Sequence, residues 1–383
     1  MRRRALPCEK AMNRRNGIST KDARRFTSVF GVLDQAIRAG AFPGCAFGVL
    51  AGGSVVMEGA AGRFTYEAHA PEVAPETVFD IASLTKVVAT TAVTMLLVER
   101  GKLDIDLPLG ELLPEFIVGR AENDLARRVR IRHLLAHNSG LPGYVEFFRT
   151  CRTPDEVIRA CFALKLEGEP GTRAEYSDPG FILLGKALEA LLGERLDVWT
   201  QREVFAELGM GATRFCPATA ARSAIPPTEE DTSFRYRRIQ GEVQDENASV
   251  LGGVAGHAGL FSSVPDLMRF ARAILGTLSK GERAEGQLFE QATVERFAER
   301  QLPVGSSRAL GWDTPSENSS AGKHFASHSI GHLGYSGCSL WIDLPESVAV
   351  VLLTNRTWPD RAGQLIREVR PAFHDAIREA LRA

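Results

Sequence analysis

The chain has 383 residues, of which 44% are hydrophobic and 24% are charged, and its formal net charge is −1. This composition is typical of an ordinary globular protein, and the near-neutral balance excludes a strong electrostatic attraction to nucleic acid or to an anionic membrane. The length exceeds that of a usual single core and predicts two packed domains.

The first 18 residues form a basic stretch that lacks the apolar run of a secretory signal. They are interpreted as a tail, and the expected location of the protein is the cytoplasm. An apolar face at helical spacing predicts an amphipathic helix over residues 19–40. Two short apolar runs, 45–50 and 54–58, follow with Ala51-Gly52-Gly53 between them, which predicts a β-hairpin.

The middle of the chain has a helical pattern. Residues 84–100 are apolar almost all round, which is typical of a buried helix, and Gly101 suits its C-terminal cap. Another helix is predicted to begin at Thr153, because Pro154 suits its first turn and Glu156 completes a capping box. Two more helices are predicted at 181–192 and 196–208.

After about residue 300 the pattern returns to strands, with candidates at 338–344 and 347–355, before a final helix over 363–382. Strands near both ends predict one mainly antiparallel sheet flanked by helices, with a helical region inserted, which is an α/β fold of the α+β kind. The predicted boundaries are a tail at 1–18, a sheet domain from 19–82 and 245–383, and a helical domain from 83–244. The active site is expected at the interface of the two domains.

No metal or cofactor site is predicted. His133 and His137 have a spacing that suits zinc on a helix, but no H-E-x-x-H sequence accompanies them, so a packing or capping role is predicted. The six cysteines are scattered without a C-x-x-C pair, which indicates reduced thiols. The basic cluster Arg235, Arg237 and Arg238 has acidic neighbours, which indicates a solvated face rather than a phosphate track.

A Ser-x-x-Lys sequence occurs twice, at Ser83 with Lys86 and at Ser320 with Lys323. Ser320 belongs to the Ser/Asn/Gly-rich stretch 315–322, which predicts an exposed loop. Ser83 opens the buried helix, where unpaired backbone N–H groups and the positive end of the helix lie, and Lys86 falls on the same face. A hydroxyl nucleophile needs an adjacent base, and a partly desolvated lysine can serve. Ser83 is therefore the predicted nucleophile.

Two further motifs follow in the chain. Tyr176-Ser177-Asp178 comes just before the helix predicted at 181, and on its own it also suits a turn and a helix N-terminus. Gly331-His332-Leu333-Gly334-Tyr335 lies on or beside a strand, where a glycine allows a substrate to approach closely.

In this order the three motifs resemble the serine β-lactamase, penicillin-binding protein and class C-like esterase superfamily, over about residues 25–380. Further matching stretches are 131–142, 208–210, 252–262 and 337–343. The resemblance implies a β-lactamase/transpeptidase-like fold and an acyl-enzyme mechanism. Ser83 would attack a carbonyl, Lys86 and Tyr176 would transfer its proton, and the backbone N–H groups of Ser83 and Tyr335 would form the oxyanion hole.

Two departures from the family pattern bear on the substrate. Asp178 replaces an asparagine, and a carboxylate near Lys86 would favour its ammonium form. We therefore expect a charged Lys86 to lower the pKa of Tyr176, which would act as the base. His332-Leu333-Gly334 replaces Lys-Thr-Gly, and the loss of the lysine charge favours esters or neutral amides over penicillins.

Asp245-Glu246-Asn247 is similar to a loop motif near the active-site rim of relatives, for which a turn-forming and a catalytic role both stay open, and His257 is not expected to act as a base. The predicted function is a serine acyl-hydrolase that acts on small carboxylic esters or amides. One alternative is a D-alanyl-D-alanine carboxypeptidase or weak β-lactamase, and another is a penicillin-binding or sensing module without turnover. The expected partner is a small-molecule ester, amide or β-lactam substrate, with neither nucleic acid nor membrane, and the oligomeric state stays open.

Overall fold

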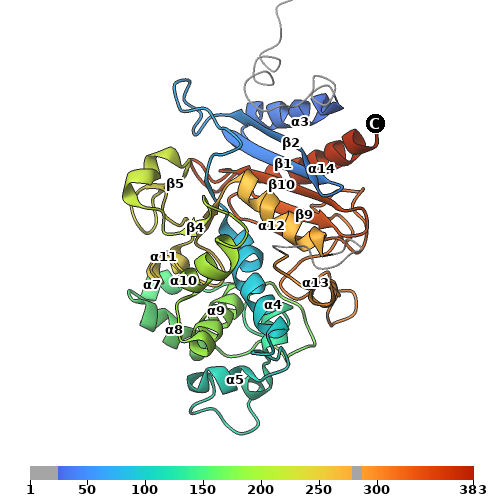
Figure 1. Ribbon diagram of the computed structural model, residues 1–383. Helices are drawn as coiled ribbons and strands as arrows, with labels where there is room; N and C mark the ends of the chain where they lie inside the picture. The colour runs from blue at the N-terminus through green and yellow to red at the C-terminus, as the bar shows by residue number, and fades with distance from the viewer. Residues whose placement is uncertain (1–24, 278–286) are drawn as a thin grey trace, which may run out of the picture.

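The computed structural model describes residues 25–277 and 287–383. The tail expected at 1–18 and the first residues of the helix expected at 19–40 lie outside this part. A five-stranded sheet in the order β2-β1-β10-β9-β8 is antiparallel throughout and is built from both ends of the chain, as predicted (Figure 1). Its strands are β1 (Gly44–Ala51), β2 (Ser54–Gly62), β8 (Ile330–Leu333), β9 (Ser339–Asp343) and β10 (Val348–Thr354).

Three helices cover the two faces of this sheet (Figure 1). They are α3 (Thr27–Arg38) and α14 (Ile366–Arg382) on one face and α12 (Val264–Gly276) on the other. The helix predicted at 19–40 is confirmed within the described residues, and the helix predicted at 363–382 begins three residues later than expected.

Side chains of β1 alternate between the two layers, because successive residues of a strand point to opposite faces. Phe47 packs edge-on against Phe30 of α3 and Phe373 of α14. The next residue, Gly48, faces α12, where an added Cβ would lie 2.6 Å from Cγ1 of Val264. The glycine therefore lets this helix pack closely on the sheet.

The apolar helix predicted at 84–100 is present, but it is not uniform. It begins as a 3₁₀ turn (Ala82–Leu84), continues as a π-helical segment (Lys86–Thr91) and ends as α4 (Ala92–Glu99), with Gly101 in the left-handed region after it. Side chains from Lys86 to Leu97 are all buried. By length and composition alone Ala82–Glu99 could cross a membrane, but 83% of it is buried inside the protein, which is typical of a core helix.

The other predicted helices are also found, with shifted ends. α8 (Pro154–Phe162) carries the predicted capping box. α9 (Asp178–Leu192) begins three residues early, because the Ser177 hydroxyl accepts a hydrogen bond from the Gly180 N–H and so caps it. The pattern at 196–208 gives α10 (Leu196–Thr200) and a π-helical segment (Gln201–Phe205).

The remaining α-helices and strands are short. The helices are α5 (Leu109–Leu112), α6 (Ile131–Leu135), α7 (Phe147–Thr150), α11 (Glu246–Val250) and α13 (Gln291–Ala298). The strands are β3 (Phe79–Asp80), β4 (Arg214–Phe215), β5 (Pro227–Asp231), β6 (Arg237–Gln240) and β7 (Leu260–Ser262). The domain boundaries predicted at 82/83 and 244/245 stay a prediction.

Candidate active site

Ser83 lies in the 3₁₀ turn that precedes the π-helical segment. The residue before it, Ala82, has φ +48°, a left-handed conformation that costs a non-glycine residue about 1–3 kcal/mol. Two hydrogen bonds hold Ala82 there: its N–H donates to Oδ1 of Asp80 (2.8 Å), and its carbonyl accepts from Oγ1 of Thr85 (2.6 Å). The predicted nucleophile Ser83 therefore lies on a tight turn that the surrounding contacts fix.

Lys86 is fully buried beneath Ser83. Its Nζ donates to Oγ of Ser83 (3.0 Å), to Oδ1 of Asp178 (2.7 Å) and to the carbonyl of His257 (3.1 Å). Three acceptors match the three protons of an ammonium group. Burial acts to lower the pKa of Lys86, but Asp178 and Tyr176 outweigh it and raise the pKa above its usual value. Lys86 therefore remains charged, as expected from the replacement of asparagine by Asp178.

The Tyr176 hydroxyl interacts with both Lys86 and Ser83. Burial raises the pKa of Tyr176 and outweighs the lowering effect of the Lys86 charge. The expected lowering effect of Lys86 is therefore present, but the net shift of the Tyr176 pKa is upward. In the free protein Tyr176 is a neutral phenol next to a charged ammonium group.

His133 and His137, whose spacing suits zinc, have the packing and capping roles that were predicted for them. The His137 ring lies 4.5 Å from the Tyr176 ring, and its Nδ1 accepts a hydrogen bond from the Ser177 N–H (2.9 Å). His133 accepts a hydrogen bond from the Arg130 N–H at the start of α6. Among residues 25–277 and 287–383, no group of three or more His, Cys, Asp or Glu side chains could hold a metal ion.

His332 on β8 is buried and lines the site, but it brings no positive charge. Its Nδ1 lies 2.8 Å from the Leu333 carbonyl, which can only accept, so Nδ1 carries the proton. Burial lowers the pKa of His332 well below its usual value, with Lys86 and Arg308 adding to the effect. Nε2 is then an unprotonated acceptor, and it has no partner in the described part of the chain.

The glycines of this motif allow close packing within the protein, and the expected close approach of a substrate stays a prediction. An added Cβ at Gly331 would lie 2.3 Å from the Trp341 ring. An added Cβ at Gly334 would lie 2.5 Å from the carbonyl oxygen of Ile81, next to the nucleophile turn. Gly334 therefore allows the segment that carries Tyr335 to pack directly against the turn that carries Ser83.

A cavity of about 910 Å³ opens above Ser83. The predicted site residues that line it are Ser83, Tyr176, Asp178, His332, Gly334 and Tyr335, while Lys86 lies beneath them. The sequence motifs did not indicate Arg308, which also lines the cavity with its guanidinium 5.3 Å from the centre of the Tyr176 ring. Its contact with Asp313 is long, at 3.8 Å, and its guanidinium makes no hydrogen bond within the described residues.

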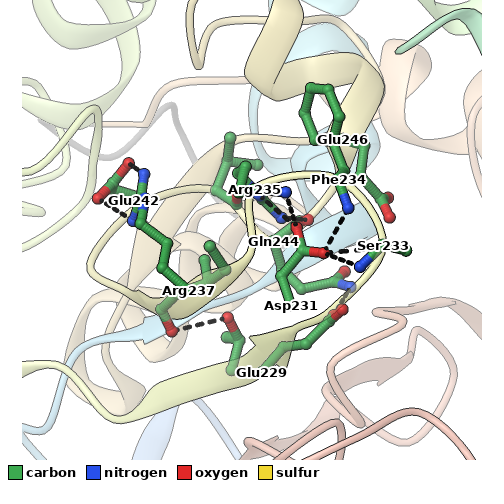
Figure 2. Close-up of polar contacts among 12 residues, drawn as sticks. Glu229, Asp231, Ser233, Phe234, Arg235, Arg237, Glu242, Gln244 and Glu246 are labelled. Atoms are coloured by element: carbon green, nitrogen blue, oxygen red, sulfur yellow. Dashed lines mark hydrogen bonds and ion pairs between the residues drawn. The ribbon is translucent and has the colours of Figure 1, made fainter. Parts of the chain in front are cut away.

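One wall of the cavity is held by the carboxylate of Asp231 (Figure 2). It accepts hydrogen bonds from the N–H groups of Ser233, Phe234 and Arg235, and it pairs with the Arg235 guanidinium at 2.9 Å. Arg235 also donates to the carbonyl of Gln244, across the loop. Arg237 and Arg238 are exposed and pair with Glu242 and Glu230, in agreement with the predicted solvated face. Arg235 departs from this prediction, because its side chain is only 9% exposed.

A short helix begins where a turn-forming role was considered, because Asp245 caps α11 by accepting a hydrogen bond from the Ala248 N–H (2.7 Å). Asp245 also lies 3.0 Å from Nε2 of His257. The His257 carbonyl, rather than its ring, contacts Lys86 and helps to orient it.

Three of the four buried histidines in the described residues have a lowered pKa, which predicts a stability that falls as the medium becomes acidic. Burial lowers the pKa of His374 to about 4 and those of His137 and His332 well below 6.5. Below pH 6.5 the unfolded chain binds protons that the folded chain excludes, so each histidine costs about 1.4 kcal/mol per pH unit down to its folded pKa. Asp80 opposes this between pH 6 and 3.8, because burial raises its pKa to about 6, but it is outnumbered.

We expect the free energy of unfolding in urea to be several kcal/mol smaller at pH 5 than at pH 7. In His374→Gln about one proton fewer should be taken up on unfolding, so the free energy of unfolding should fall less steeply with decreasing pH. The control His69→Gln, at an exposed position, should leave it unchanged. An equal pH dependence in the wild type and in His374→Gln would contradict the assignment.

Comparison with known proteins agrees with this geometry. The model of the beta-lactamase family matches residues 30–372. The N-acetylmuramyl-L-alanine amidase of Bacillus subtilis (strain 168) is 31% identical over 370 residues, which cover 88% of this chain and 82% of that protein.

Two solved structures have similar folds. EstCE1, a hydrolase with promiscuous acyltransferase activity, gives a TM-score of 0.73 at 23% identity, over 93% of this chain and 100% of that chain. A class C beta-lactamase from Rhodobacter sphaeroides gives a TM-score of 0.71 at 21% identity, over 92% of this chain and 99% of that chain. The predicted β-lactamase/transpeptidase-like fold is confirmed. The match over most of the length, together with the ordered motifs, shows that the chain belongs to the beta-lactamase family of serine hydrolases.

Proposed function

We propose that the protein forms an acyl-enzyme on Ser83 and hydrolyses amide or ester bonds of small carboxylic substrates. The observation that carries this proposal is the 3.0 Å contact between the Ser83 hydroxyl and a buried, charged Lys86 at the floor of the cavity. A hydroxyl becomes a useful nucleophile only when its proton can leave and the developing negative charge is stabilised.

In the acylation step Ser83 Oγ bonds to the substrate carbonyl carbon, and the carbonyl oxygen becomes an oxyanion. The Ser83 proton passes to the Tyr176 oxygen as the phenolic proton moves to the leaving nitrogen or oxygen. The bond to the leaving group then breaks. Lys86 keeps its protons and stabilises the negative charge that develops on the Ser83 and Tyr176 oxygens. Water later attacks the ester on Ser83 by the same route in reverse.

Arg308 favours substrates whose leaving group carries a carboxylate. It lies beside Tyr176, which delivers the proton to the leaving group. Within the described residues its guanidinium makes a 3.8 Å ion pair with Asp313 but no hydrogen bond, so it can still donate to a substrate. It can supply the positive charge that position 332 lacks, which supports carboxylate-bearing substrates beside the neutral ones expected from His332. The name of the Bacillus subtilis relative supports an amide next to an amino acid, of the N-acetylmuramyl-L-alanine type.

Arg308→Gln should lower kcat/KM about 10- to 100-fold for N-acetylmuramyl-L-alanine, because a charged hydrogen bond contributes about 1.5–3 kcal/mol. The same substitution should leave kcat/KM nearly unchanged for p-nitrophenyl butyrate and for the C-terminally amidated N-acetylmuramyl-L-alanine. Arg149→Gln serves as the matched control, since Arg149 lines the same cavity but is paired with Glu146. If Arg308→Gln lowered kcat/KM equally for the amidated substrate and for the substrate with a free carboxylate, carboxylate recognition by Arg308 would be contradicted.

The two alternatives are decided by the same assays. Faster turnover of a D-Ala-D-Ala peptide or of nitrocefin would assign a carboxypeptidase or β-lactamase activity. Labelling of Ser83 by a fluorophosphonate without turnover of any substrate would assign a sensing module. A cytoplasmic location is part of the proposal and is tested by fractionation of cells that produce the full chain.

A further inference from the structure

The segment Gly334–Cys338, which we call the oxyanion loop, joins β8 to β9 and packs on the nucleophile turn. Gly334 lies against the Ile81 carbonyl, and the Ser336 hydroxyl donates to the Asp80 carbonyl (2.8 Å). The backbone N–H of Tyr335, in the middle of the loop, has no acceptor among the described residues. It is therefore available to a substrate oxygen beside Ser83.

Every carbonyl of the oxyanion loop accepts a hydrogen bond. Arg370 donates to those of Gly334 (2.6 Å), Gly337 (3.2 Å) and Cys338 (2.9 Å), Arg356 donates to that of Tyr335 (2.7 Å), and Thr354 donates to that of Ser336 (2.8 Å). The directions of all five peptide groups are thus set from outside the loop. The side chain of Arg370 alone holds three of them.

Arg370 projects from the first turns of α14 and is 7% exposed. No carboxylate pairs with it among the residues that the structure describes, so its partners are carbonyl oxygens. Burial lowers its pKa to about 10, which still leaves it charged at neutral pH. A buried charge without a counter-ion is costly to maintain, and such a cost is tolerated where the charge has a use.

We propose that Arg370 is a positioning residue for the oxyanion hole. Its planar guanidinium fixes the oxyanion loop so that the Tyr335 N–H points at the same position as the Ser83 N–H. Arg370 also lines the cavity, and its charge beside the loop stabilises the negative oxygen of the tetrahedral intermediate, because such interactions are strong in a site that excludes water. This inference rests on the acyl-hydrolase function proposed above.

A structural role for Arg370, in holding α14 to the sheet, would predict a loss of stability alone. Arg378 supplies the matched control, because it lies on the same helix, is 4% exposed and pairs with Asp343, away from the cavity. The variants are Arg370→Gln, Arg370→Lys and Arg378→Gln. For each, kcat and KM for p-nitrophenyl butyrate, the urea unfolding curve and the inhibition constant of phenylboronic acid are measured.

Arg370→Gln should lower kcat about 10- to 100-fold with little change in KM, which is less than the loss of a whole oxyanion-hole donor. Phenylboronic acid forms a tetrahedral adduct, so its affinity should fall in proportion to kcat/KM. Arg370→Lys, which keeps the charge but not the planar fork, should recover part of kcat. Arg378→Gln should be less stable with unchanged kcat.

A folded Arg370→Gln with wild-type kcat would overturn the proposal. The proposal would also be overturned if Arg378→Gln, at the same stability as Arg370→Gln, lost as much kcat. If Arg370→Gln does not fold, Arg370→Lys becomes the deciding variant. Wild-type kcat and wild-type boronate affinity in Arg370→Lys would show that the planar guanidinium is not needed, and would overturn the proposal. Failure of the proposed function gives a different result, namely that Ser83→Ala keeps its activity whatever happens at Arg370.

Discussion

Ser83→Ala is expected to reduce kcat for amide and ester substrates by at least about 10⁴-fold, because loss of the nucleophile removes the covalent route and leaves only binding and the oxyanion hole. Stability should change little, since Lys86 retains its bonds to Asp178 and to the His257 carbonyl. Initial rates, with a urea unfolding curve for each protein, test both statements.

The second Ser-x-x-Lys sequence provides the control for this experiment. Ser320 contributes its carbonyl to a bond with His374, so Ser320→Ala should keep wild-type kcat. A fluorophosphonate probe should label the wild type and Ser320→Ala, but not Ser83→Ala. Labelling that persists in Ser83→Ala would place the nucleophile elsewhere.

Lys86→Met is expected to lower kcat about 10²- to 10⁴-fold, the range of a lost acid–base partner, and to destabilise the fold by about 3 kcal/mol. The methionine matches the lysine stem in length, so packing is largely kept. The cost in stability arises because Asp178 loses its ion-pair partner at 2.7 Å. Rates and urea unfolding curves measure the two effects separately.

Adding Asp178→Asn to Lys86→Met should recover part of the stability without recovering activity, since the unpaired carboxylate is removed but the ammonium group is still missing. Lys186→Met is the control, because Lys186 is exposed on α9 and should matter to neither quantity. Recovery of activity in the double variant, or near-normal kcat in Lys86→Met, would show that the ammonium group has no chemical role.

The parts of the site that were predictable from sequence are local. Ser83 and Lys86 are one helical turn apart on a buried helix, so their contact follows from helix geometry and apolar neighbours. The end of α9 at Gly193 follows from its left-handed conformation, which glycine adopts without strain. The sheet from both ends was predictable because strand-like runs flank the helical middle.

The parts that were not predictable depend on contacts between distant segments. Arg308 and Arg370 are single arginines in no recognisable pattern, and their partners are a ring on a middle segment and the carbonyls of the oxyanion loop. The net direction of the Tyr176 pKa depends on burial, which comes from packing and not from the neighbouring charge alone. The role of Gly334 likewise appears only once Ile81 lies against it.

The sheet combines strands from both ends of the chain. It therefore cannot be completed early in synthesis, and this limits when activity can begin. A nascent chain that has emerged as far as α9 already carries Ser83, Lys86 and Tyr176, but β8, the oxyanion loop and α14 are still to be translated. Until the oxyanion loop and α14 have emerged from the ribosome, the Ser83 hydroxyl lacks the proposed donors for a negative oxygen. We therefore expect hydrolysis to start only after α14 has been synthesised, and a nascent chain that ends before α14 should be inactive.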